Sequence, residues 1–164
     1  MSRWSSLKSA ASGVVVFTHT LCTIYVVSQY GVFFSKVSGP SMFPTFSGQG
    51  DVVVVDALSK WRGIIRPGDV VICSRPVDPK ENIIKRVTAV GDQYVVVYPD
   101  RDHTHVRRVL VPPGHMWIEG DNPAHSLDSR QYGPVPLALV KGVVVAQVWP
   151  RFRFMWDTSS GLHR

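Results

Sequence analysis

Ser41 lies in a segment whose backbone has little freedom. Residues 39–45 read Gly-Pro-Ser-Met-Phe-Pro-Thr, and each proline fixes its own φ and pushes the preceding residue toward extended geometry. A stiff loop of this kind exposes a single hydroxyl group, which suits a nucleophile, although an ordinary rigid turn can have the same sequence. A serine hydroxyl attacks poorly until a neighbouring base removes its proton. The rest of the chain must therefore supply a base.

Lys85 is a candidate base because the chain around it is predicted to bury it. In the segment 82–88, strand alternation places Ile83, Lys85 and Val87 on one face. Burial between two branched apolar side chains lowers the pKa of a lysine and so favours a neutral amine that can accept a proton. A surface lysine on an ordinary strand fits the spacing equally well. The other possible base is a histidine of a Ser-His-Asp triad, for which only His115 merits a test.

A long polar loop over residues 120–134 is the third segment that could support chemistry. It contains many side chains that hydrogen-bond main-chain groups in turns, and Asp128 and Arg130 are close enough in sequence to form an ion pair. An ordinary well-ordered loop has the same composition. The loop alone therefore does not establish a site.

The elements that must position these residues are predicted to be β-strands. After Ser35 no convincing amphipathic helix appears, and short β-branched runs recur between glycine and proline turns. The predicted strands cover residues 51–55, 69–74, 83–90, 94–98, 107–111, 115–119 and 141–149. This pattern favours an all-β domain over residues 35–150, folded as a closed or partly closed barrel. Residues 151–164 form an aromatic and basic tail that a partner or a bilayer could bind.

The N-terminal residues are predicted to form a membrane anchor. Residues 1–10 are rich in serine, contain Arg3 and Lys8 and lack acids, as mitochondrial targeting segments do. Residues 11–34 carry no charge at neutral pH and would span about 36 Å as a helix, more than the ~30 Å hydrocarbon core of a bilayer. A cleaved signal peptide or a buried helix would be alternatives. The N-terminal positive charge predicts that the β-domain lies across the membrane from the N-terminus.

Composition argues against several functions. Lysine and arginine exceed the acids by six, but the excess is spread without a basic stripe, so we do not expect nucleic-acid binding. Attraction to an anionic lipid bilayer explains the excess more simply. The two cysteines lie in the apolar segment and in a predicted strand, so neither a disulfide nor a cysteine-based metal site is expected. The proposed chemistry requires no metal or organic cofactor.

Four segments of the chain resemble, in order, the conserved boxes of type I signal peptidases. They are Ser-Gly-Pro-Ser-Met-x-Pro-Thr at 38–45, Gly-Asp-Val-Val at 68–71, Ile-Lys-Arg-Val at 84–87 and Gly-Asp-Asn-x-x-x-Ser-x-Asp-Ser-Arg at 120–130. Within that family the chain is most similar to the mitochondrial inner-membrane members. It is short, lacks the large inserted domain of bacterial enzymes, and carries His-x-Trp-x-Glu-Gly-Asp-Asn at 115–122.

The resemblance implies a Ser/Lys dyad with Ser41 as the nucleophile and Lys85 as the general base. The implied supporting residues are Ser126, which would orient the lysine, the ion pair of Asp128 and Arg130, the apolar Met42 beside the nucleophile, and the box glycines Gly39 and Gly120. Bacterial members often have an oxyanion-binding serine where this chain has Gly39. They also usually have arginine where it has Pro123.

The resemblance further implies a single-pass endopeptidase of the mitochondrial inner membrane. Its catalytic domain would face the intermembrane space, remove sorting signals from precursor proteins, and pair with a second peptidase subunit in a heterodimer. Polar residues within 11–34 agree with a helix that packs against another membrane protein. The alternatives are a bacterial plasma-membrane signal peptidase and a non-catalytic peptide-binding subunit.

Overall fold

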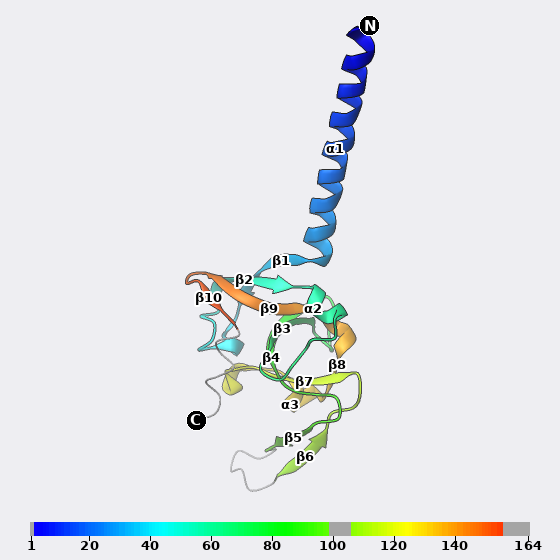
Figure 1. The fold of residues 1–164 in the computed structure, drawn as a ribbon. Coiled ribbons are helices and arrows are strands. Elements are labelled where there is room, and N and C mark those ends of the chain that lie inside the picture. The colour runs from blue at the N-terminus through cyan, green and yellow to red at the C-terminus, as the bar shows by residue number, and fades with distance from the viewer. Residues whose placement is uncertain (1, 99–105, 156–164) are drawn as a thin grey trace.

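One long helix projects from a β-rich body in the computed structural model, which describes residues 2–98 and 106–155. Helix α1 (Ser2–Tyr30) carries the N-terminus at its far end, and the strands gather at its C-terminal end (Figure 1). Side chains described between residues 14 and 26 of α1 are exposed and mostly apolar, including those of Val14, Phe17 and Ile24. The body therefore folds around its own core, and α1 stands apart from it.

Helix α1 differs from the predicted anchor in its bounds. It ends at Tyr30, and residues 32–34 belong instead to strand β1 (Val32–Ser38). Antiparallel pairing with β2 (Gln49–Asp56) explains the difference, since the ladder begins with Val32 opposite Asp56 and Gly31 O accepts a 2.8 Å hydrogen bond from Ala57 N. In the parts of the chain described, no helix has both the length and the hydropathy needed to cross a membrane. The predicted transmembrane anchor is thus not confirmed.

The body is a β structure, as the sequence predicts, and its strand pairs are antiparallel. The main sheet has the order β1-β2-β9-β3-β4-β7-β8, with β10 also paired to β9, and strands β5 and β6 form a separate pair. The bounds of the remaining strands are β3 Val70–Ser74, β4 Asn82–Val90, β5 Tyr94–Val97, β6 Arg107–Leu110, β7 His115–Glu119, β8 Val135–Pro136, β9 Val140–Trp149 and β10 Arg153–Phe154. Every predicted strand is confirmed, and β1, β8 and β10 are additional.

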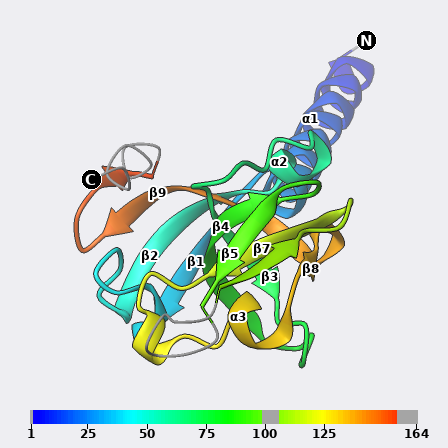
Figure 2. The ribbon, with the colours of Figure 1, turned by 90° about the horizontal axis from the view of Figure 1, so that it is seen from below.

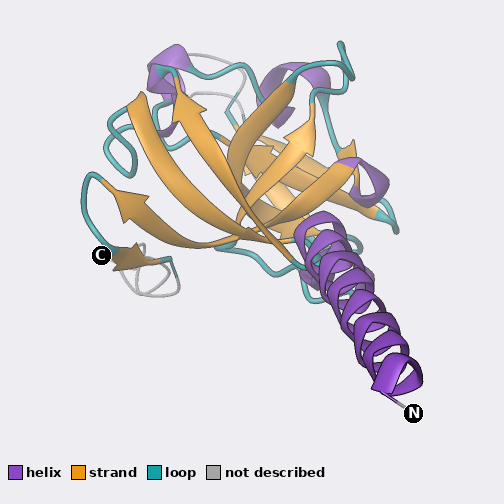
Figure 3. Ribbon diagram, turned by 90° about the horizontal axis from the view of Figure 1, so that it is seen from above, coloured by secondary structure: helices purple, strands orange, loops and turns teal. Residues whose placement is uncertain are grey.

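The main sheet bends strongly but does not close. Strands β1 and β8 end the order without pairing with each other in the described chain, so no closed barrel forms. Figure 3 shows the strands curving around the interior, and Figure 2 shows the same arrangement from the opposite side. The curvature brings the end of β1 near the start of β4, although these strands are distant in the sheet order. An open edge thus remains on β1.

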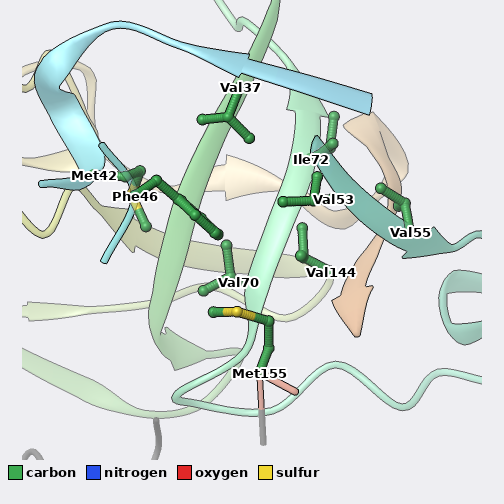
Figure 4. Packing of buried hydrophobic residues seen from close by; sticks show 9 residues of the cluster. All are labelled: Val37, Met42, Phe46, Val53, Val55, Val70, Ile72, Val144 and Met155. Carbon is green, nitrogen blue, oxygen red and sulfur yellow. The ribbon is translucent and has the colours of Figure 1, made fainter. Parts of the chain in front are cut away.

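Two of the three buried apolar clusters among the described residues pack on opposite faces of strand β3. One joins β1, β2, β3 and β9 and includes Met42 and Phe46, both about 1% exposed, from the segment that follows β1. Figure 4 shows these two side chains pointing into the same interior as Val53 and Val70. The other cluster contains Val71, Cys73 and Val87 among others. Burying a side chain of this size contributes roughly 1.5–3 kcal/mol. The core therefore fixes the segment around Ser41 on the body.

Candidate active site

Ser41 lies in a short 3₁₀ helix, η1 (Pro40–Met42), which the fold holds at both ends. Before it, Gly39 has φ 92°, a conformation that non-glycine residues rarely adopt, and its N–H donates to Gly48 O over 3.0 Å. After Ser41, Met42 is buried and its main-chain oxygen accepts a 2.9 Å hydrogen bond from Phe46 N. The serine is half-buried, so its hydroxyl lies at the surface of a rigid segment.

Lys85 reaches Ser41 from the middle of strand β4. Its Nζ donates a hydrogen bond to Ser41 Oγ over 2.8 Å, and the lysine is only 4% exposed. Ile83 and Val87, on the same face of β4, are also buried, which agrees with the alternation predicted from sequence. The distance is within the range in which a neutral amine takes a proton from a hydroxyl. The geometry therefore allows Ser41 to act as a nucleophile and Lys85 as its base.

The surroundings of Lys85 favour its neutral form. Burial lowers the pKa of the Lys85 ammonium, and the positive charges of Arg75 and Arg130 act in the same direction. The carboxylate of Asp128 and the thiol of Cys73 oppose the shift, but the pKa still falls below its ordinary value. A lowered pKa increases the fraction of lysine that can act as a base near neutral pH.

Asp128 is a buried hydrogen-bond acceptor at the centre of the polar loop. It is 0% exposed, and its carboxylate accepts hydrogen bonds from Gly120 N at 2.9 Å, Ser126 Oγ at 2.5 Å and Arg130 Nη2 at 2.6 Å. Burial alone would raise the pKa of Asp128, but the hydrogen bonds from Arg130, Ser126 and Gly120 outweigh it, so the pKa is lowered. The predicted Asp128–Arg130 ion pair is present in the structure.

Ser126 does not make the contact predicted for it. Its hydroxyl donates to Asp128, and the described residues show no hydrogen bond between Ser126 and Lys85. Gly120 packs so closely on Ser126 that a Cβ on the glycine would lie 2.2 Å from Ser126 Oγ and 2.6 Å from Ser41 O. The glycine therefore allows the loop to approach Ser41, and the Ser126 hydroxyl forms its hydrogen bond within the loop rather than to the lysine.

Arg86 and Asp121 form a second ion pair that the sequence analysis missed. Arg86 is 8% exposed and donates to the Asp121 carboxylate through Nε at 2.9 Å and Nη2 at 2.7 Å. The next residue, Asn122, donates from its main-chain N to Ser41 O at 2.9 Å and from Nδ2 to Pro40 O at 3.0 Å. The sequence did contain a signal for the Arg86–Asp121 pair, because each residue lies in a segment that resembles a conserved box of the signal peptidases.

A cleft of about 400 Å³ opens beside Ser41 and Lys85, a size suited to several substrate side chains. Its walls come from the end of β1, the start of β4 and the loop after β7. The described lining residues are Ser35, Lys36, Val37, Ser38, Gly39, Ser41, Ile72, Arg75, Asn82, Ile83, Ile84, Lys85, His125 and Leu127. His125, which the sequence did not single out, thus lines the cleft.

His115 has a different environment. Its Nδ1 lies 3.1 Å from Pro113 O within its own turn, while the Ser41 hydroxyl is paired with Lys85. The geometry therefore favours the lysine over the histidine triad. The described residues include no group of histidine, cysteine and acidic side chains that could hold a metal ion.

Comparison with known proteins gives the family. Residues 10–101 and 96–149 match the sequence family described as signal peptidase, peptidase S26. The chain belongs to the S26 signal peptidase family. It is accordingly a serine protease of the signal peptidase type, as its four sequence boxes predicted.

Relatives within the S26 family are mitochondrial by name. The chain is 38% identical over 133 residues to mitochondrial inner membrane protease subunit 1 of Schizosaccharomyces pombe, covering 80% of this chain and 83% of that protein. It is 41% identical over 133 residues to the human protein of the same name, covering 77% and 76%. A crystal structure of a signal peptidase I from Enterococcus faecalis aligns over 48% of this chain and 95% of that chain, with 20% identity and a TM-score of 0.42.

Proposed function

We propose that this S26 peptidase is a membrane-anchored endopeptidase that uses Ser41 and Lys85 to remove sorting signals from precursors delivered to the mitochondrial intermembrane space. The hydrogen bond of 2.8 Å between Lys85 Nζ and Ser41 Oγ, at a lysine that is 4% exposed, is the observation on which the proposal rests. The names of the relatives support the compartment. The proposed anchor is α1, whose exposed apolar side chains support it.

The proposed reaction begins with a proton transfer from Ser41 to the neutral Lys85 amine. The serine oxygen then attacks the substrate carbonyl, and the Ser41 main-chain N–H, which has no acceptor within the first turn of η1, stabilises the oxyanion together with the Ser38 hydroxyl at the cleft. Lys85 next donates its proton to the departing amine. It finally takes a proton from the water that hydrolyses the acyl-enzyme, and it returns that proton to the Ser41 oxygen as the acid product leaves.

The substrate would bind as an additional strand. Strand β1 ends the main sheet in the described chain, and its last residues line the cleft, so its main-chain groups can pair with an extended peptide. Small side chains of the peptide would then face Ile72 and Ile83 across the cleft. This binding mode presents a peptide carbonyl to Ser41.

A second peptidase subunit is the proposed partner. The relatives are named as subunits, so an assembly of more than one chain is expected. The polar residues within α1 would provide side chains that hydrogen-bond another helix in the membrane. The lipid bilayer is the other proposed contact, and we expect no nucleic-acid partner.

Purified protein incubated with a precursor that carries an intermembrane-space sorting signal tests this function. We expect cleavage at a single position, alone or after addition of the second subunit, with the new amino terminus mapped by mass spectrometry. Ser41→Ala should give no product, while His115→Ala should cleave within about twofold of wild type, because a residue outside the site contributes little to the barrier. An inactive His115→Ala would restore the triad, and a wild type inactive under both conditions would favour a non-catalytic subunit.

A further inference from the structure

The loop that follows Ser41 is held at Thr45 from two sides. On one side, the Thr45 hydroxyl donates to Asp121 and accepts a 3.3 Å hydrogen bond from Arg86 Nη2. On the other side, the main-chain oxygen of Thr45 accepts a hydrogen bond from Arg153 Nη2. Separate parts of the chain thus fix the side chain and the main chain of one residue close to the nucleophile.

Arg153 comes from the C-terminal strand β10 and extends the contact into the core. It lies opposite Gln147 in the β9–β10 ladder, and its Nη2 also donates to Gln147 Oε1 at 3.1 Å. Gln147 Nε2 in turn donates to Asp51 Oδ1 at 2.8 Å. Asp51 is 1% exposed. The Gln147 side-chain amide thus links the Arg153 guanidinium to a buried carboxylate by two hydrogen bonds.

Asp51 anchors the far end of the same loop. Its Oδ2 accepts hydrogen bonds from Ser47 Oγ at 2.7 Å and Gly48 N at 3.0 Å, and Gly48 O accepts the hydrogen bond from Gly39 N at 3.0 Å. Gly39 directly precedes η1. The hydrogen bonds that start at Arg153 therefore reach the loop after Ser41 at two places. One is Thr45, and the other is the Gly39–Gly48 hydrogen bond beside η1.

We propose that Arg153 is a positioning residue for Ser41, so that strand β10 completes the active site without touching substrate. Arg153 is absent from the described lining of the cleft and instead borders a separate hollow with Phe43, Thr45 and Phe154. Its effect must pass through Thr45 and the loop. It should therefore alter how fast Ser41 attacks rather than how tightly the substrate binds. This inference rests on the proposed role of Ser41 as nucleophile.

The test compares Arg153→Met, which keeps the length of the side chain but removes its donors, with Arg151→Met. Arg151 is exposed in the same hairpin, so the control loses the same charge. We expect Arg153→Met to lower kcat for precursor cleavage by about 10- to 100-fold, the loss typical of a displaced reacting group, with KM within about twofold. Arg151→Met should match wild type. Thermal unfolding of each variant establishes that the protein is folded.

Arg153→Lys provides a second, milder variant. Its shorter ammonium cannot hold Thr45 O and Gln147 Oε1 in the same positions, so we expect kcat to fall by about 3- to 10-fold, between wild type and Arg153→Met. If Arg153→Met does not fold, Arg153→Lys decides the question by the same comparison. A wild-type kcat in a folded Arg153 variant, a loss confined to KM, or an equal loss in Arg151→Met would each overturn the proposal.

Ser41→Ala in the same assay separates this inference from the proposed function. If Ser41→Ala cleaves normally, the proposed function fails. If Ser41→Ala is inactive and the Arg153 variants have wild-type kcat, only the positioning role of Arg153 fails.

Discussion

Replacing Lys85 with arginine is expected to abolish precursor cleavage. Arginine keeps the positive charge but stays protonated at any working pH, so it cannot take a proton from Ser41. Removal of a general base typically lowers the rate by about 10²- to 10⁴-fold. Rates measured under single-turnover conditions with Lys85→Arg give this loss directly.

Two comparisons make the Lys85→Arg result decisive. Lys80→Arg makes the same change at an exposed lysine and should leave turnover unchanged. Circular dichroism and thermal unfolding show whether the buried guanidinium is accommodated in the fold. Normal turnover by folded Lys85→Arg would rule out the dyad.

Asp128→Ala is expected to cause the largest loss of stability among the residues of the site. The substitution leaves the Gly120 N–H, the Ser126 hydroxyl and the Arg130 guanidinium without their common acceptor. Leaving a buried donor without its acceptor typically costs about 1–3 kcal/mol of unfolding free energy for each donor. Denaturant unfolding measures this loss, and Asp128→Asn should lose less because it keeps an acceptor oxygen.

The pH dependence of stability gives an independent check on Asp128. The pKa of this carboxyl is lower in the folded protein than its ordinary value of 3.8. Its contribution to stability is therefore complete above that ordinary value and is lost as the pH falls through the folded pKa. Asp128→Ala should lack this part of the acid dependence.

Asp78→Ala, at an exposed acid, is the control and should cost less than about 1 kcal/mol of unfolding free energy. Equal losses in the two variants would contradict the role given to Asp128.

The sequence was sufficient for the strands and for the burial of Lys85. Alternation along β4 depends only on local spacing, and Ile83 and Val87 are buried with the lysine as that spacing requires. Pairing of Ser41 with Lys85 came instead from the resemblance to signal peptidases. Local patterns cannot bring two residues together across the fold, because that depends on the bending of the sheet.

The start of strand β1 could not be separated from the preceding helix by sequence. Residues 32–34 are apolar, and their hydropathy continues that of residues 11–30, although in the structure they pair with β2. Hydropathy records the preference for an apolar environment and not which surface supplies it. The same limit applies to the predicted anchor, which the hydropathy of the described helix does not confirm.

The ion pair between Arg86 and Asp121 could not be predicted from local sequence patterns. Alternation along β4 places Arg86 on the other face of the strand from Lys85, where a charged residue would usually be exposed. Arg86 is nevertheless buried, because β4 lies between β3 and β7. Its partner Asp121 lies in a distant loop, so no periodic pattern predicts the pair. The predicted hydrogen bond between Ser126 and Lys85 is absent for a local reason. The Ser126 hydroxyl donates instead to Asp128, two residues away.

The pKa of the Lys85 amine tests the account most directly. Protein labelled with ¹³C at lysine Cε gives one NMR signal for each lysine, and the signal missing from Lys85→Arg identifies Lys85. The ordinary pKa of a lysine side chain is about 10.4. We expect the Lys85 signal to titrate at a clearly lower pH, because burial destabilises its ammonium form. A Lys85 signal that titrates at the ordinary lysine pKa would contradict a neutral lysine base.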